Sequence, residues 1–162
     1  MMSISAVSSS SGASSYYEVD DYYTKDNTGD HTQLSSWQGK GAELQGLSGS
    51  VSPEDFKRVL DGVTPDGQEL GRQVDGKRIH RAGLDLTFSP PKSVATMAQV
   101  YGDKRIIQAH NQAVKETLAL VESFAAKARV TQGTETHHEK TRNLTMATFF
   151  HTSTRAQDPG MH

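Results

Sequence analysis

The chain has 162 residues, of which 34% are hydrophobic, and a formal net charge of -2. This length fits one domain or a fragment of one, and it is enough to bury a hydrophobic core. A nearly neutral charge excludes a uniformly basic nucleic-acid binder, so any contact with nucleic acid must come from a local patch. The absence of cysteine excludes disulfide frameworks, thiolate metal sites and cysteine nucleophiles, and it fits a reducing, cytoplasmic compartment. No secretory signal opens the chain, and no apolar stretch reaches the length of a membrane span.

The first feature along the chain is a cluster of tyrosines. Loose alternation predicts a strand over residues 2–8, and the serine-rich stretch 8–15 predicts a turn into a helix. Four of the five tyrosines then fall within residues 16–23, as Tyr16, Tyr17, Tyr22 and Tyr23. The commoner interpretation of tyrosines on a helix is packing under a sheet, but a deprotonated phenol is also a nucleophile. The pairing of the tyrosines favours the functional interpretation.

The single tryptophan, Trp37, follows a polar loop predicted for residues 24–36. Gly39 and Gly41 come just after it, but they are no dinucleotide fingerprint because the third glycine of that pattern is absent. We expect these glycines to let the backbone turn tightly beside the indole. Trp37 is able to stack on a base, although a lone tryptophan more often belongs to a core.

Three helices are predicted in the middle of the chain. Ser52 and Pro53 begin one as N-cap and first helical residue, and it is expected to end at Gly62. Residues 64–81 contain turn signals and are predicted to be a loop. A second helix at 92–100 begins after a Pro-Pro pair, and its first residues suit phosphate contact. The third and longest, 104–128, carries an apolar stripe, which indicates that it covers one face of a sheet.

Residues 83–89 give a strong strand signal with an acid in the middle. Leu84, Leu86 and Phe88 share one face, and Asp85 lies on the other with Thr87 and Ser89. A lone acid in such a strand usually points to solvent, and less often it is aimed into a cleft. Both interpretations of Asp85 stay open at this point.

The histidines lie mostly in the last third of the chain. Strands are predicted at 129–135 and 143–154, with a polar turn at 136–140 that contains His137 and His138. Adjacent strand residues point in opposite directions, so these two are not expected to share a metal. His110, next to the stripe of the long helix, is expected to be structural. His151 and His162 are eleven residues apart and match no short metal-site pattern, although imidazole suits divalent ions.

The order and the amino-acid sequences of these segments resemble those of the conjugative relaxases of the MobF class. The matching segments include the two Tyr-Tyr pairs, WQGKGAELQGLSG at 37–49, HRAGLDLTFSPPKS at 80–93, NLTMATFFHTSTR at 143–155 and DPGMH at 158–162. The resemblance covers most of the chain, and the doubled tyrosines with DLTFS-x-PKS are specific. The family more often has Ala where this chain has Pro90.

The resemblance implies a fold and a set of residue roles. The fold is an antiparallel α+β sheet with flanking helices, shared with rolling-circle replication initiators. Tyr16 aligns with the tyrosine that attacks the scissile phosphate, Tyr17 lies beside it, and Tyr22 and Tyr23 align with a second pair. Asp85 aligns with the acid near the nucleophile. His151 and His162 align with the first two of three ligands to a divalent ion such as Mg or Mn, and the chain ends before the third.

The implied activity is strand nicking at a plasmid transfer origin, with a 5′-phosphotyrosyl intermediate on Tyr16. The implied partners are single-stranded DNA and other conjugation proteins, with no membrane. Residues 1–162 would be the N-terminal part of the relaxase domain, without the helicase. The alternatives are a non-catalytic remnant with residual binding of single-stranded DNA, a related replication initiator, and a plain α+β domain. Tyrosines that precede the histidines favour the relaxase over the initiator.

Overall fold

The computed structural model describes residues 1–7, 9, 12, 35–152 and 160–162. The helix predicted to carry Tyr16, Tyr17, Tyr22 and Tyr23 lies outside the described residues.

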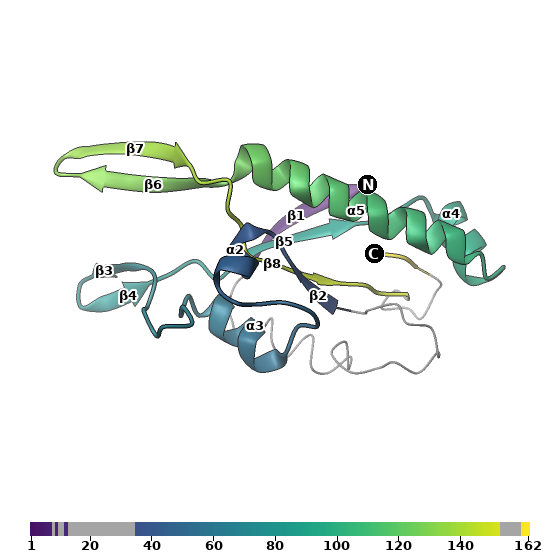
Figure 1. The fold of residues 1–162 in the computed structure, drawn as a ribbon, viewed down its shortest axis with the longest axis horizontal. Coiled ribbons are helices and arrows are strands. Elements are labelled where there is room, and N and C mark those ends of the chain that lie inside the picture. Colours follow the sequence, from purple (N-terminus) through teal and green to yellow (C-terminus); the bar gives the residue numbers. More distant parts are fainter. Residues whose placement is uncertain (8, 10–11, 13–34, 153–159) are drawn as a thin grey trace.

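All strand pairs among these residues are antiparallel (Figure 1). The pairs are β1 (Met2–Val7) with β5 (Gly83–Phe88), β2 (Ser35–Gln38) with β8 (Met146–Phe149), β3 (Arg72–Val74) with β4 (Lys77–Ile79), and β6 (Lys127–Gln132) with β7 (Glu135–Lys140). The helices are α2 (Lys40–Leu44), α3 (Pro53–Leu60), α4 (Lys92–Gln99) and α5 (Lys104–Ala125). The expected class, an antiparallel α+β fold with flanking helices, is confirmed.

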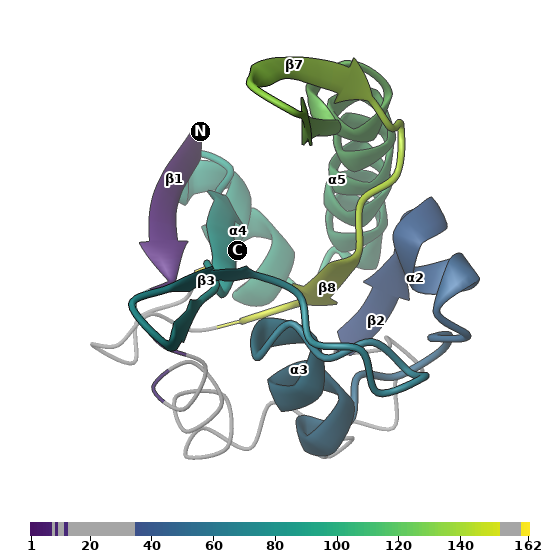
Figure 2. The ribbon, with the colours of Figure 1, turned by 90° about the vertical axis from the view of Figure 1, so that its left-hand side faces the viewer.

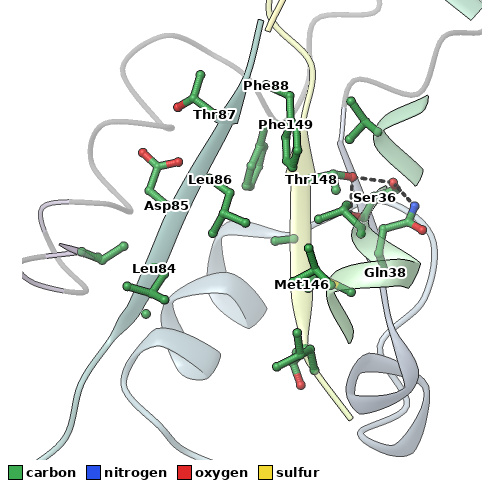
Figure 3. A pocket seen from close by; sticks show the side chains of 18 of the residues that line it. Ser36, Gln38, Leu84, Asp85, Leu86, Thr87, Phe88, Met146, Thr148 and Phe149 are labelled. Carbon is green, nitrogen blue, oxygen red and sulfur yellow. Dashed lines mark hydrogen bonds between the residues drawn. The ribbon is translucent and has the colours of Figure 1, made fainter. Parts of the chain in front are cut away.

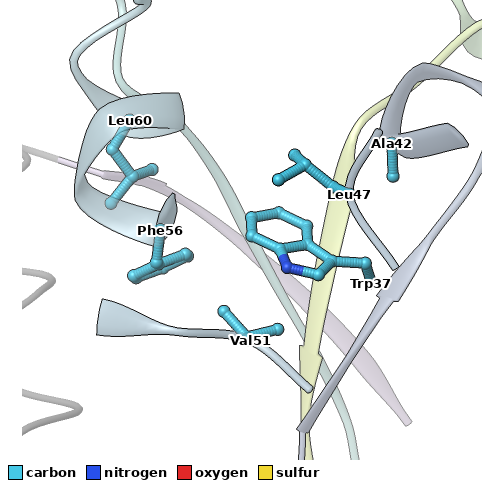
Figure 4. Packing of buried hydrophobic residues seen from close by; sticks show 6 residues of the cluster. All are labelled: Trp37, Ala42, Leu47, Val51, Phe56 and Leu60. Atoms are coloured by element: carbon cyan, nitrogen blue, oxygen red, sulfur yellow. The ribbon is translucent and has the colours of Figure 1, made fainter. Parts of the chain in front are cut away.

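The larger hydrophobic core lies between α3 and the β2–β8 pair (Figure 4). It is a cluster of buried side chains from β2, α2, α3 and the segment that links the two helices: Trp37, Ala42, Leu47, Val51, Phe56 and Leu60. Phe149 of β8 packs against it, its ring 5.2 Å from that of Phe56 at 74°. Because Trp37 belongs to this buried cluster, it is a core residue.

Helix α3 begins at Pro53 because the Ser52 side chain accepts a hydrogen bond from the Asp55 amide at 3.1 Å and Pro53 follows at N1.

A buried carboxylate on α5 joins this helix to the start of α2 and to the segment that precedes β8. Glu122 is 9% exposed, and its Oε1 accepts hydrogen bonds from the Lys40 amide at 2.9 Å and the Leu144 amide at 2.8 Å. The backbone of Leu144 comes so close to Gly39 that a Cβ there would clash with the Leu144 carbonyl oxygen. Gly39 also has a φ of 89°, which favours glycine. Glycine is thus required here by the approach of a distant segment as well as by the turn.

A second, smaller core joins α4 and α5. Ala95 and Ala98 of α4 pack with Met161, and Ile106, Ile107 and Phe150 surround them. Asp103 caps α5, accepting a hydrogen bond from the Arg105 amide at 3.1 Å. The Arg105 side chain is the main reason that the pKa of Asp103 is lowered.

Three expectations from the sequence were wrong. The segment predicted as a loop at 64–81 contains the β3–β4 hairpin, with Asp75 and Gly76 at positive φ in its turn. Two-residue hairpin turns favour such a pair, but the strands lack the hydrophobic alternation that predicts a strand. The polar turn predicted at 136–140 is the strand β7. The longest helix ends at Ala125, because the chain turns extended at Ala126 (φ -67°, ψ 106°) to begin β6.

In the part of the chain that the structure describes, no helix is long and apolar enough to cross a membrane.

Candidate functional site

The two histidines singled out in the sequence are neighbours. The amide of His151 donates to the carbonyl oxygen of His162 at 2.8 Å, and the amide of His162 donates back to His151 at 3.2 Å. The Gly160 amide donates to the carbonyl oxygen of Thr152 at 3.1 Å, so residues 151–152 and 160–162 run antiparallel beside each other. The two imidazole rings lie edge to face with centroids 4.7 Å apart. Backbone pairing thus brings together two side chains that are eleven residues apart in the sequence.

Buried neighbours hold His162 in place. Met161 is 2% exposed and packs in one cluster with Ala95 and Ala98. The Gln99 side-chain amide donates to the carbonyl oxygen of Gly160 at 2.5 Å. No local pattern predicts either contact, because both join residues that are about sixty positions apart.

Asp85 lies on the wall of the same pocket as His151 and His162. It is exposed and pairs with Ser5 across the β1–β5 ladder. Figure 3 shows Asp85 and Thr87 on one side of β5 and Leu86 on the other, toward β8. Burial lowers the pKa of His162, and the negative charge of Asp85 raises it in part. Asp85 is thus an exposed residue that also lines the pocket, and both interpretations of it stay open.

His110 of α5 also lines this pocket. Its ring lies 6.4 Å from that of Phe150, the residue before His151. Burial is the main cause that lowers its pKa, followed by the positive charges of the N-terminal amine and of His162. From the sequence we expected His110 to be structural. Its place next to the apolar stripe of α5 does not indicate that it lies beside the candidate site.

The opposite wall of the pocket carries hydroxyl and amide groups from β2 and β8. The hydroxyls of Ser36 and Thr148 are 2.8 Å apart, and the Gln38 side-chain amide donates to Ser36 at 2.9 Å (Figure 3). The same Thr148 hydroxyl donates to the carbonyl oxygen of Ser36 at 2.9 Å. These groups satisfy one another and fix the β2–β8 pair across the pocket from Asp85.

The donor set fits part of a metal site. Two imidazoles lie side by side, and the lowered pKa of His162 favours the neutral form that binds metal. Within residues 1–7, 9, 12, 35–152 and 160–162, no group of three histidine or acidic side chains is placed to hold an ion. His137 lies on the far β7 strand and hydrogen-bonds to Glu139 at 2.9 Å, so it belongs to a different part of the molecule.

Fold and pocket together define a class of protein: an antiparallel α+β domain whose pocket carries imidazole and carboxylate groups. The family model of the TrwC relaxase matches residues 10–162. The chain belongs to the TrwC relaxase family.

Known relatives agree with this assignment. The multifunctional conjugation protein TraI of Escherichia coli is 46% identical over 163 residues, which cover 100% of this chain and 9% of TraI. The conjugative relaxase TrwC, solved metal-bound in complex with oriT DNA, matches with a TM-score of 0.82 and 39% identity over 99% of this chain and 54% of that one. A copper-bound TrwC complex with oriT DNA matches with a TM-score of 0.82 and 42% identity, over 99% and 55%. The chain thus spans about half of the solved relaxases and a small part of TraI.

Proposed function

We propose that residues 1–162 form the N-terminal part of a relaxase domain that nicks one DNA strand at a transfer origin. The observation that carries the proposal is that Asp85, His151 and His162 all line one pocket in a chain of the TrwC relaxase family. The solved relatives bound to oriT DNA support single-stranded DNA at a transfer origin as the substrate. Other proteins of the conjugation machinery are the expected partners.

The proposed reaction is a transesterification. The Tyr16 phenol loses its proton to Asp85, and its oxygen forms a bond to the scissile phosphorus. The bond from phosphorus to the 3′ oxygen breaks, and this oxygen leaves as a hydroxyl after taking up a proton. The strand stays attached through a 5′-phosphotyrosyl bond, which conserves the energy for rejoining. Tyr17 follows the nucleophile in the sequence, and we assign Tyr22 and Tyr23, the second Tyr-Tyr pair, to a later strand transfer.

His151 and His162 would hold a divalent ion, with Mg and Mn as the candidates. A bound divalent ion polarises the phosphoryl oxygens and stabilises the negative charge that develops on them. The backbone ladder fixes the main chain of both histidines, and the His151 side chain is buried, so the pair loses little freedom when it binds a ligand. Metal-bound TrwC structures support this proposal.

The test is cleavage of a transfer-origin oligonucleotide by a chain that continues past His162, with Mg²⁺ or Mn²⁺ present. The parent is expected to give a covalent protein–DNA product and a free 3′-hydroxyl fragment. Tyr16→Phe is expected to give neither, because it lacks the attacking oxygen. Equal cleavage by Tyr16→Phe and the parent would refute the assignment.

A further inference from the structure

The β1–β5 pair has one apolar side and one polar side. In its antiparallel register Ser3 lies opposite Thr87, and Ser5 lies opposite Asp85. Directly paired residues share a side of the sheet, so these four residues form one block, which we call the polar face. The other side carries three apolar pairs: Met2 with Phe88, Ile4 with Leu86, and Ala6 with Leu84. The pair thus gathers small hydroxyl groups around a single carboxylate.

The polar face is on the side of the sheet that α3 covers. Gly83 begins the row of β5 that contains Asp85 and Thr87, because residues two apart on a strand share a side. A Cβ on Gly83 would lie 3.7 Å from the side chain of Leu60 in α3. The side chains of Asp85 and Thr87 therefore leave the sheet in the direction of this helix.

His151 projects to the same side. Phe149 of β8 packs against Phe56 of α3, whereas the next residue, Phe150, packs with the core of α4 and α5. Figure 2 shows α3 and α5 on opposite sides of β8. Since successive side chains of an extended chain alternate, His151 points to the side of α3 again. The polar face and the histidine pair thus share one side of the domain.

The hydroxyl of Thr87 is available to a ligand. Thr87 is half-buried and lines the pocket, and Figure 3 shows it next to Asp85 on one side of β5. In the part of the chain that the structure describes, this hydroxyl makes no hydrogen bond to another residue. The hydroxyls of Ser36 and Thr148 on the opposite wall, in contrast, satisfy each other.

Distance favours the scissile phosphate as the partner of this hydroxyl. A nucleophile within hydrogen-bond reach of Asp85 must also come within about 3–3.5 Å of the phosphorus, which is then at most about 7 Å from the carboxylate. Thr87 is two residues along the strand from Asp85, which is a separation of about 7 Å. A neutral donor at this place also offsets the repulsion between the carboxylate and the phosphate.

We propose that Thr87 is a substrate-binding residue whose hydroxyl donates a hydrogen bond to a non-bridging oxygen of the scissile phosphate. The inference rests on the proposed function, which brings this phosphate to Asp85, and it adds a contact to the roles of Tyr16, Asp85 and the histidines. Thr87 makes and breaks no covalent bond. It holds the phosphate in place while the oxygen of Tyr16 attacks.

The experiment measures binding of a transfer-origin oligonucleotide by fluorescence anisotropy. The parent is a chain that continues past His162 and carries Tyr16→Phe, so that the strand is not cleaved. A second oligonucleotide has a methylphosphonate at the nick site, in which a methyl group replaces one charged oxygen. Thr87→Val is expected to weaken binding of the unmodified strand about 10–100-fold, the range for a hydrogen bond to a charged group. It is expected to weaken binding of the methylphosphonate strand far less, because the charged acceptor is already removed.

Two further variants separate the hydroxyl from the shape of the side chain. Thr87→Ser keeps the hydroxyl and is expected to bind both strands as the parent does. Thr117→Val makes the matched change on α5, where the hydroxyl donates to the carbonyl oxygen of Ala113 at 2.7 Å, and it is expected to bind as the parent does. Thermal unfolding checks the fold of Thr87→Val, whose midpoint is expected to equal that of the parent because valine suits a strand.

Three results would overturn the contact: parent-like binding by Thr87→Val, an equal loss with both oligonucleotides, or an equal loss in Thr87→Ser. In each of them, the absence of cleavage by Tyr16→Phe would still support the proposed function. Cleavage by Tyr16→Phe would overturn the proposed function, while a loss in Thr87→Val confined to the unmodified strand would still support the contact. A parent that binds neither oligonucleotide overturns both.

Discussion

The imidazoles of His151 and His162 meet edge to face because the backbones of these two residues pair in both directions. Their separation along the sequence matches no metal-binding motif. A short antiparallel backbone ladder nevertheless brings the two residues together. The site is therefore a product of tertiary structure.

His151→Ala is expected to weaken the binding of Mn²⁺ at least tenfold, because it removes a ligand that the ladder holds in place. Isothermal titration calorimetry on a chain that continues past His162 measures the affinity. His137→Ala, a histidine on the exposed β7 strand, is the matched control and is expected to bind as the parent does. Equal affinity of His151→Ala and the parent would contradict the ligand assignment.

Met161 is the anchor of His162, and its truncation is expected to disturb both stability and site. Met161→Ala removes a side chain that is 2% exposed, with an expected loss of about 2–5 kcal/mol in the free energy of unfolding. Met161→Leu conserves the volume and is expected to lose less than about 1.5 kcal/mol. Denaturant unfolding measures both, and a loss in Met161→Ala no larger than in Met161→Leu would show that the contact with α4 is not what fixes the chain there.

Asp85→Asn is expected to lower the rate of oligonucleotide cleavage by about 10²–10⁴, because the amide cannot accept the proton of Tyr16. Single-turnover cleavage measures the rate. Asp66→Asn makes the same change on an exposed loop and is expected to leave the rate unchanged. A parent-like rate in Asp85→Asn would remove this residue from the proposed chemistry.

Glu122→Ala is expected to reduce the free energy of unfolding by several kcal/mol, since each of the two amides that lose their acceptor costs about 1–3 kcal/mol. Glu122→Gln keeps an oxygen that is able to accept and is expected to lose less. Glu116→Gln, exposed on the same helix, should stay within about 0.5 kcal/mol of the parent. Chemical denaturation compares the three, and the account of Glu122 is wrong if Glu122→Ala behaves like Glu116→Gln.

Local signals in the sequence predicted much of the fold. The Ser52 cap and Pro53 located α3, and the alternation around Asp85 located β5, because in both cases neighbouring residues determine the conformation. The β3–β4 hairpin was missed because its three-residue strands are charged and give no periodic signal. The strand β7 was missed for a similar reason, since all six of its residues are exposed.

The pocket depended on contacts between distant residues. Asp85, His151 and His162 were selected by their residue types and by the family resemblance, and the structure places all three on one pocket. The roles of Met161, Gln99 and Glu122 had no local signal, because each acts on a backbone or core segment far away in the sequence. His110, next to the helix stripe, is predicted to be structural, since helical periodicity alone does not say what the neighbouring face contacts.

The most direct test of the central claim is to identify the residue that becomes attached to DNA. A chain that continues past His162 is incubated with a transfer-origin oligonucleotide and Mn²⁺, the covalent complex is digested with protease and nuclease, and the modified peptide is sequenced by mass spectrometry. We expect a nucleotide on Tyr16. Attachment to a residue outside the tyrosine cluster, or no covalent product from a chain that binds the oligonucleotide, would contradict it.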